Sequence, residues 1–202
     1  MNDNFIFYYG VMGSGKTRAI FSSRYDEISK DRNVIIIKPS KDKKGDSKIV
    51  SRDGEEIEVD FLISPKDNIY NIISEYLLYY NLDTILVDEV QFLTHKHIEQ
   101  LKNVSYIFNK KVICYGLLTD FRGLLFEGSK SLIENGCELI EIRKKCEMGM
   151  CDNRASFNAR FINDEFVLDG EQVAIDGVDA TYKSLCGKCY DKLKKRCLNK
   201  KI

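Results

Sequence analysis

The residues of this chain best suited to chemistry begin in the stretch GVMGSGKT, which runs from Gly10 to Thr17. The stretch fits the phosphate-loop pattern G-x-x-x-x-G-K-[ST] at every defined position and lies between an apolar run and a helical pattern. In such a loop backbone N–H groups surround a phosphate, Lys16 would reach the β- and γ-phosphates, and the Thr17 hydroxyl would bind Mg²⁺. We therefore predict a nucleoside triphosphate site formed by Gly10, Val11, Met12, Gly13, Ser14, Gly15, Lys16 and Thr17.

Two adjacent carboxylates, Asp88 and Glu89, follow the apolar run Ile85–Val87. An acidic residue at the end of a strand is the second signature of phosphate-loop proteins, so we expect Asp88 to hold Mg²⁺ on the Thr17 side or through a bridging water. Neighbours in an extended chain point to opposite faces, so Glu89 would have a separate task. It could orient a water in a hydrolase or accept the proton of an acceptor hydroxyl in a small-molecule kinase. The local sequence leaves both tasks open.

Four of the seven cysteines have a spacing typical of a metal site. Cys186 and Cys189 form a C-x₂-C pair. Cys146 and Cys151 form a C-x₄-C pair, so the two pairs together predict a tetrahedral Cys₄ zinc site. A site closed by four protein ligands would be structural. Buried free thiols, or a redox-active pair at Cys186, are the alternatives.

The other cysteines and the two histidines are interpreted as structural residues. We expect Cys114 and Cys137 to lie in the core and Cys197 to lie at the surface. His95 and His97, in the stretch THKH, are expected to be exposed at the start of a helix and not to bind a metal.

Short apolar runs alternate with helical patterns along the first 145 residues. We predict strands at 5–9, 34–38, 85–87, 111–115 and 139–142, and helices at 16–30, 69–80, 97–108 and 128–135. Strands that are apolar throughout and are separated by helices are typical of a buried parallel sheet. The predicted fold class is therefore α/β, with a P-loop NTPase-like parallel sheet flanked by helices, over an ATP-binding domain of residues 1–145.

The remainder of the chain, residues 146–202, changes in character. Cysteines cluster at both of its ends, and short strands and turns are predicted between them, so we expect a second, smaller domain stapled by zinc. Within the first domain, the polar stretch 41–60 is interpreted as a solvated loop or hairpin. A flexible loop that closes over phosphate is the alternative.

Composition narrows the class of protein. The formal net charge is zero and 44% of the residues are hydrophobic, which is ordinary for a soluble globular protein and gives no field to attract nucleic acid or a membrane. The apolar runs are too short to span a bilayer, and the N-terminus MNDNFIFYYG does not resemble a secretory signal. We expect a cytoplasmic protein with reduced cysteines.

Taken together, these features resemble the type II thymidine kinase family, in its bacterial and T-even phage branch. The resemblance is carried by YYGVMGSGKT, by VSR at 50–52, by VDEVQFL, by CYGLLTDFRGLLFEGS at 114–129 and by the two cysteine pairs, in the family's order. It covers almost the whole chain. The chain departs from the family in G-S-G-K-T for the usual N-A-G-K-S, in the x₄ spacing of the first cysteine pair, and in Lys44, where relatives often carry arginine.

The resemblance implies transfer of the ATP γ-phosphoryl group to the 5′-hydroxyl of thymidine in nucleotide salvage, with Glu89 as the catalytic base. Deoxyuridine could also serve as the acceptor. It further implies Mg²⁺ with ATP, a structural zinc ion, a homotetramer, and a lasso within residues 146–202 that closes over the nucleoside. The residues at the family's nucleoside-binding positions are Phe92, Leu117, Phe121, Phe126, Asn158, Val173, Ile175, Gly177 and Tyr182.

Two other functions stay open on the residues alone. The first is a kinase for another deoxynucleoside, and the second is a P-loop ATPase whose zinc ribbon binds nucleic acid. The second function predicts a basic surface with exposed aromatic residues along 146–202. Residues 152–182 instead hold seven acidic residues and two arginines, a balance that disfavours binding to a phosphate backbone.

Overall fold

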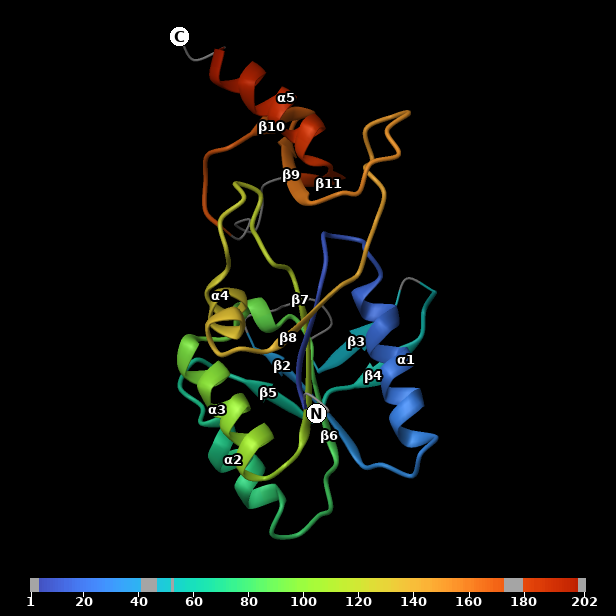
Figure 1. Ribbon diagram of the computed structural model, residues 1–202, viewed down its shortest axis with the longest axis vertical. Coiled ribbons are helices and arrows are strands. Elements are labelled where there is room, and N and C mark those ends of the chain that lie inside the picture. Colours follow the sequence, from blue (N-terminus) through green and yellow to red (C-terminus); the bar gives the residue numbers. More distant parts are fainter. Residues whose placement is uncertain (1–3, 41–46, 52, 173–179, 200–202) are drawn as a thin grey trace. The chain divides into compact units, whose positions relative to one another are not determined.

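The computed structural model describes residues 4–40, 47–51, 53–172 and 180–199, which form two compact units (Figure 1). The first unit contains the chain up to Tyr9, Gly15–Gly116 and Glu127–Glu141. The second unit contains Gly10–Ser14, Leu117–Phe126 and the chain from Ile142 onward. Two short segments from the earlier part of the chain thus belong to the second unit. A domain boundary at residue 145 stays a prediction.

A six-stranded parallel sheet forms the centre of the first unit, in the order β5-β2-β6-β7-β1-β8. Its strands are β1 Phe5–Tyr9, β2 Val34–Pro39, β5 Phe61–Ile63, β6 Thr84–Val87, β7 Lys111–Gly116 and β8 Glu138–Glu141. The central strands β2, β6 and β7 are buried along almost their whole length, because helices cover both faces of the sheet. The predicted α/β class with a buried parallel sheet is confirmed.

Helix α1 lies on one face of this sheet, and α2 and α3 lie on the other (Figure 1). The helices of the first unit are α1 Lys16–Ile28, α2 Ile69–Tyr76, α3 His95–Ile107 and α4 Glu127–Glu134, with a 3₁₀ helix η1 at Val90–Phe92. The Asn68 side chain accepts a hydrogen bond from the Asn71 N–H at the start of α2, as short polar residues do at helix starts. All four predicted helices are confirmed, each ending earlier than predicted. Among the described residues, no helix is both long and apolar enough to cross a membrane.

The described part of the polar stretch 41–60 contains a hairpin, which was one of its predicted forms. Strands β3 Lys48–Val50 and β4 Glu56–Glu58 pair as an antiparallel hairpin. The next strand, β5, joins the main sheet beside β2, and the sequence reading missed it because a three-residue apolar run gives little periodicity. Residues 41–46 and 52 lie outside the described residues, and the position of Lys44 lies there too.

The second unit is built on a three-stranded antiparallel sheet in the order β10-β9-β11, followed by helix α5. These elements are β9 Phe157–Ile162, β10 Glu165–Val167, β11 Ala180–Leu185 and α5 Gly187–Asn199. Leu185 and Tyr190 lie in its core, and the Tyr190 ring stacks on Phe157 with centroids 4.5 Å apart. Short strands after the first cysteine pair were predicted and are confirmed.

A buried carboxylate, Glu27, ties the C-terminal end of α1 to the N-terminal ends of β6 and β7. It accepts hydrogen bonds from Lys111 Nζ at 2.8 Å, Thr84 Oγ1 at 2.8 Å and an Arg32 Nη at 2.9 Å. Burial alone would raise the pKa of the Glu27 carboxyl, but these three hydrogen bonds and the charge of Lys111 lower it to about 2. A carboxyl whose pKa is lowered on folding stabilises the folded state at every pH where it is ionised.

The Glu27→Gln variant tests this contribution. Lowering the pKa from 4.5 to about 2 corresponds to about 3 kcal/mol, fully present above pH 4.5 and lost as the pH falls towards 2. We expect the variant to unfold more easily than the wild type at pH 6 and the difference to shrink by pH 3.5, measured by urea denaturation. Glu134→Gln, at an exposed ion pair with Lys130 of 3.7 Å, is the control and should change little. A difference independent of pH would contradict the assignment.

Candidate functional site

The phosphate loop leaves β1 after Tyr9 and enters α1 at Lys16. Gly13 has a φ of 67°, and Gly15, the N-cap of α1, has a φ of 98°. Glycine adopts a positive φ at little cost, whereas a residue with a Cβ is strained there. Two of the motif's glycines thus occupy positions where the backbone requires glycine. The loop runs directly into a helix N-terminus, where backbone N–H groups favour an anion.

Gly10 and Ser14 meet in the first half of this loop. A Cβ added at Gly10 would lie 2.5 Å from Ser14 Oγ and 2.7 Å from the Ile142 carbonyl oxygen, so only glycine fits. Ser14 Oγ is buried and has no hydrogen-bond partner within the part of the chain that the structure describes. A buried hydroxyl without a partner is costly, so the loop is suited to an anion that would accept this hydrogen bond.

Strand β6 brings Asp88 to the edge of the sheet at which β1 also ends. Because β7 alone separates β6 from β1, the two strand ends lie about 10 Å apart. The Asp88 N–H donates to the Ile37 carbonyl at 3.0 Å, and the Asp88 carboxylate accepts the Glu89 N–H at 2.9 Å. Asp88 therefore stands at the carboxyl edge, where ligands bind in open α/β sheets.

Glu89 does not continue the strand. Its φ of 48° and ψ of 38° are left-handed, and it is the N-cap of η1. The expectation that strand alternation separates Glu89 from Asp88 is therefore wrong at this residue, because the backbone turns instead of extending. A left-handed residue other than glycine costs about 1–3 kcal/mol and is found most often at functional sites. The backbone of Glu89, as well as its carboxylate, marks it as a candidate functional residue.

Gln91 and two glycines hold the turn that follows Glu89. Gln91 is buried, and its Nε2 donates to Glu89 Oε2. A Cβ on Gly116 would lie 2.4 Å from Gln91 Oε1, and one on Gly128 would lie 2.3 Å from the Val90 carbonyl oxygen. β7 and α4 can therefore approach η1 this closely only with glycine at these points. Sequence reasoning missed this support, and its one signal was the two glycines within CYGLLTDFRGLLFEGS.

The predicted nucleoside-binding residues divide between the units. Phe92 is half-buried in η1 of the first unit. The second unit contains Leu117, Phe121, Phe126, Asn158 and Tyr182. Three more positions, Val173, Ile175 and Gly177, lie outside the described residues.

Arg160, on β9, brings two of these aromatic residues together. Its guanidinium carbon lies 3.5 Å from the centroid of the Phe121 ring, and its Nε donates to Tyr182 Oη at 3.1 Å. Its Nη2 donates to the Glu171 carbonyl at 2.6 Å. Arg160 is only 4% exposed, so these partners replace the water that its charge would otherwise require. No motif marked this arginine in the sequence.

Asp120 and Arg122 fix a tight turn in the same unit. Arg122 Nε and Nη2 donate to Asp120 Oδ2 at 2.9 and 2.7 Å, and the Leu124 N–H donates to Asp120 Oδ1 at 3.0 Å. The turn also binds a later part of the chain: Arg122 donates to the Gly170 carbonyl at 3.4 Å, and Gln172 Nε2 donates to Asp120 at 3.3 Å. Residues 170–172, which lead towards the predicted lasso, are thus held by side chains of this turn and of β9.

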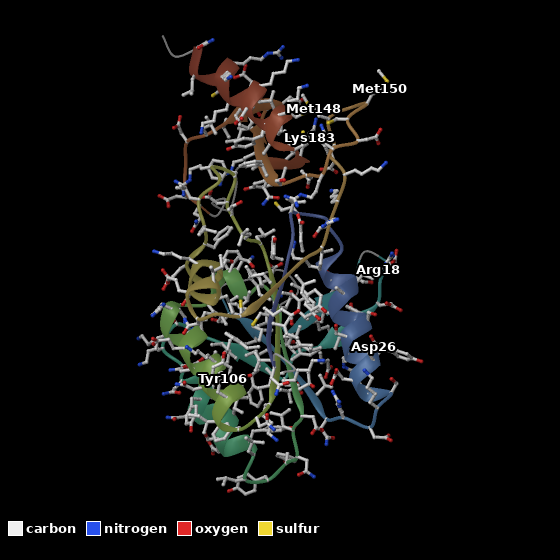
Figure 2. The ribbon with its side chains drawn as sticks, in the orientation of Figure 1. Arg18, Asp26, Tyr106, Met148, Met150 and Lys183 are labelled. Atoms are coloured by element: carbon white, nitrogen blue, oxygen red, sulfur yellow. The ribbon has the colours of Figure 1, made fainter. Side chains whose placement is uncertain are left out.

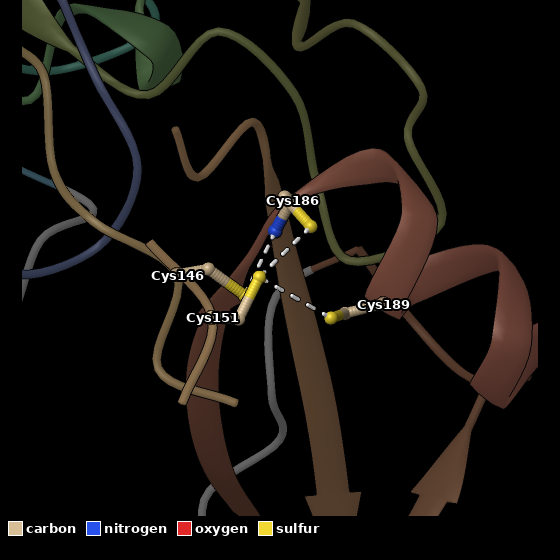
Figure 3. Close-up of side chains that lie close together, drawn as sticks. All are labelled: Cys146, Cys151, Cys186 and Cys189. Carbon is tan, nitrogen blue, oxygen red and sulfur yellow. Dashed lines mark hydrogen bonds between the residues drawn. The ribbon is translucent and has the colours of Figure 1, made fainter. Parts of the chain in front are cut away.

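The four predicted zinc ligands lie together in the second unit (Figure 3). Their sulfur atoms all lie within 4.8 Å of one another. Cys151 Sγ lies 3.7 Å from Cys186 Sγ and 3.8 Å from Cys189 Sγ. Four thiolates at about 2.3 Å from one zinc ion would be separated by about 3.8 Å, so the cluster, completed by Cys146, fits a structural zinc site. The predicted convergence of the two pairs is confirmed.

The thiols of this cluster differ in acidity: burial and the neighbouring cysteines raise the pKa of Cys189 to about 12, whereas that of Cys186 is lowered. The Cys189 backbone N–H lowers the pKa of Cys186 to about 7, and neighbouring thiols add to the effect, which favours the thiolate that zinc binds. Burial raises the pKa of Cys114 well above its ordinary value and that of Cys137 to about 12. Both are buried as predicted and are suited to packing. Within the described chain, the four cysteines are the one group of three or more His, Cys, Asp or Glu side chains whose ligand atoms lie close enough to share a metal ion.

The prediction that both histidines are exposed is wrong for His97. Its side chain is buried and forms a capping box with Thr94 at the start of α3, and its Nε2 lies 3.1 Å from the Asp67 carbonyl oxygen. His95 is exposed and pairs with Glu99 at 3.3 Å. Both histidines therefore serve the start of the helix.

The family model and the most similar curated proteins point to one family. A family model described as "Thymidine kinase" matches residues 3–190. The chain is 36% identical over 187 residues to a thymidine kinase of Shewanella oneidensis, covering 90% of this chain and 93% of that protein. It is 36% identical to one of Haemophilus influenzae and 37% identical to one of Pasteurella multocida, each over 183 residues that cover 89% of this chain and 92% of the relative.

Similarity to solved structures is weaker. A crystal structure of Bacteroides Pif1 bound to ssDNA aligns with a TM-score of 0.38 and 13% identity, over 69% of this chain and 38% of that chain. A similarity of this size supports no conclusion about function.

Metal analysis tests the four-cysteine cluster. We expect the purified protein to carry one zinc ion per chain and Cys186→Ser to lose most of it, with a lower unfolding temperature, because three ligands leave the site open. Cys197→Ser is the matched control, since Cys197 lies outside the cluster, and it should keep the metal. Less than one zinc per chain in the wild type would contradict the site.

Proposed function

The chain belongs to the thymidine kinase family, and we propose that it transfers the γ-phosphoryl group of ATP to the 5′-hydroxyl of thymidine, giving dTMP. The observation that carries the proposal is the family match over residues 3–190, which includes the phosphate loop, Glu89 and the four cysteines. Deoxyuridine, which lacks only the 5-methyl group, is a second acceptor in this proposal.

The phosphate loop, residues 10–17, is proposed to bind ATP. Its backbone N–H groups and the N-terminus of α1 would surround the phosphates, and Lys16 would neutralise charge on the β- and γ-phosphates. Ser14 Oγ, buried without a partner in the described chain, supports this assignment. Thr17 and Asp88 would hold the Mg²⁺ that accompanies ATP and that neutralises charge developing on the phosphates.

Glu89 is proposed to accept the proton of the thymidine 5′-hydroxyl as the oxygen attacks phosphorus. A loose phosphoryl-transfer transition state needs placement more than covalent chemistry, so a rigid base is an advantage. Three features support this role: the left-handed backbone of Glu89, the Gln91 hydrogen bond to one carboxylate oxygen, and the packing of Gly116 on Gln91. Gln91 binds Oε2, so Oε1 is the oxygen to which we assign the proton.

Nucleoside binding is proposed for apolar and aromatic side chains together with backbone groups, as is usual in concave sites. The assigned residues are Phe92, Leu117, Phe121, Phe126, Asn158, Val173, Ile175, Gly177 and Tyr182. The stacking of Arg160 on Phe121 supports a preset position for that ring, because a buried aromatic covered by a guanidinium has little freedom to rotate.

The Cys₄ cluster is proposed to bind structural zinc and to staple a lasso that closes over the nucleoside and excludes water. The anchoring of residues 170–172 by Arg122 and Arg160 supports a fixed base for such a lasso. From the family resemblance we also propose a homotetramer and a cytoplasmic location, with no nucleic-acid or membrane partner.

A phosphorylation assay with labelled ATP and a panel of nucleosides tests the function. We expect thymidine to be converted to its monophosphate, with deoxyuridine as the next substrate. Phosphate release without any nucleoside monophosphate would contradict the proposed kinase activity and favour an ATPase.

In the same assay Glu89→Gln should lower kcat by about 10²- to 10⁴-fold while ATP still binds, since a positioned base contributes that much. Glu99→Gln, an exposed carboxylate on α3, is the matched control and should keep full activity. Activity lost in Asp88→Asn but retained in Glu89→Gln would overturn this division of roles.

A further inference from the structure

The backbone of Met12, in the phosphate loop, is bound on both sides of its Cα by side chains from much later in the chain. Its N–H donates to Asn158 Oδ1 at 2.8 Å. Its carbonyl accepts from Ser184 Oγ at 2.7 Å and from Lys144 Nζ at 3.3 Å. Asn158 and Ser184 are 4% and 1% exposed, so two of the three side chains that bind this backbone are buried. We name Asn158, Ser184 and Lys144 the Met12 clamp.

The other hydrogen bonds of the clamp residues hold each of them in position. Asn158 Nδ2 donates to the Thr119 carbonyl at 3.1 Å, so backbone groups fix both ends of the amide. Lys144 forms an ion pair with Glu147 at 2.9 Å. The other carboxylate oxygen of Glu147 accepts the Ser184 N–H at 2.6 Å, and the Glu147 N–H donates to the Ser184 carbonyl at 2.8 Å. The clamp is therefore part of a closed network in which no member can rotate freely.

The same two chain segments carry the cysteine cluster. Glu147 follows Cys146 directly, and Ser184 precedes Cys186 by two residues. The Cys186 N–H donates to Cys146 Sγ at 3.3 Å, which joins the two segments a short distance along the chain from the clamp. The cysteine cluster and the backbone of Met12 are thus held by the same two segments of the second unit.

Phosphate binding depends on the direction in which each N–H of the loop points. The Met12 N–H belongs to the peptide group before its Cα and the Met12 carbonyl to the peptide group after it, so the clamp holds two consecutive peptide groups that could otherwise rotate. These groups lie next to the left-handed Gly13 and within the turn closed by the Ser14 N–H on the Val11 carbonyl at 3.2 Å. Holding them therefore limits the conformations open to the first half of the loop.

We propose that Asn158, Ser184 and Lys144 are positioning residues for ATP binding, which act by fixing the two peptide groups that flank Met12 in the phosphate loop. The cysteine-stapled sheet thereby sets the affinity for ATP, in addition to any part in binding the nucleoside. The inference rests on the proposed function only in that the loop binds ATP.

The Ser184→Ala variant provides the test, because it removes one hydroxyl and little volume. We expect the Kd for ATP, measured by calorimetry without nucleoside, and the KM for ATP to rise about five- to tenfold, as for loss of one buried hydrogen bond. The kcat and the KM for thymidine should stay within about twofold. Lys144→Met, which removes the longer hydrogen bond, should act in the same direction to a smaller extent.

Ser131→Ala is the matched control. Ser131 is also a buried serine with a hydrogen-bonded hydroxyl, 2.6 Å from His95 Nδ1, but it lies on α4 of the first unit. We expect its ATP affinity to equal that of the wild type. An unchanged ATP affinity in Ser184→Ala, or an equal loss in Ser131→Ala, would overturn the inference.

Selective ¹⁵N-methionine labelling gives a second readout, independent of catalysis. The chain has four methionines: Met1, Met12, Met148 and Met150. Met148 and Met150 lie on the loop between the first two cysteines (Figure 2), and the Met12 amide signal can be assigned with Met12→Leu. Asn158→Leu should move the Met12 signal strongly, because it removes the acceptor of that N–H. A Met12 signal that does not move would overturn the inference.

Different results would contradict the proposed function and the inference about Met12. Wild-type protein that binds ATP but phosphorylates no nucleoside would remove the proposed function. This inference would then stand on the calorimetric and amide measurements, which need no nucleoside.

Discussion

Parallel pairing of β1 with β7 and of β7 with β6 is the constraint on which the chemistry of the first unit depends. The register places Tyr9 beside Gly116 and Val87 beside Cys114, so the chain segments that follow these strands all leave from one edge. A slip of one residue would exchange the two faces of a strand and misplace the side chains that pack against the helices, so the apolar side chains that fill the core also set where the carboxylates stand. Close packing then adds the second requirement: η1 fits against β7 and α4 because both present glycine.

In the second unit, paired polar and charged groups hold the structure in position. Two of its charged groups, Asp120 and Arg160, are buried and each has several partners; Asp120, for example, accepts hydrogen bonds from the side chain and backbone of Arg122. Buried polar groups cost free energy unless they are fully paired, and a fully paired network has few alternative arrangements. A small sheet with a modest apolar core can in this way hold a turn, a phosphate-loop peptide and a cysteine cluster in fixed positions.

Patterns of neighbouring residues in the sequence were enough to predict much of the fold and part of the candidate site. The phosphate loop, the strand before Asp88 and the cysteine spacings are each set by neighbours within a few residues, so a pattern can reveal them. Contacts between distant segments could not be predicted in this way. In the sequence Arg160 is one charged residue in a short strand pattern, and only the packing of residues 117–126 against β9 gives it a role. The burial of His97 likewise depends on the Asp67 carbonyl, 30 residues earlier, and the backbone of Glu89 on glycines in β7 and α4.

The Met12 clamp binds backbone groups and not the Met12 side chain, and this determines which substitutions each position tolerates. Any residue with an N–H can keep all three of these backbone hydrogen bonds, so position 12 is free to change its side chain as far as the clamp is concerned, with proline as the exception. Asn158 has no such freedom, because it must accept from one backbone group and donate to another. Two residues that touch can thus differ widely in tolerance to substitution, and variation at position 12 would be a poor guide to whether the contact persists.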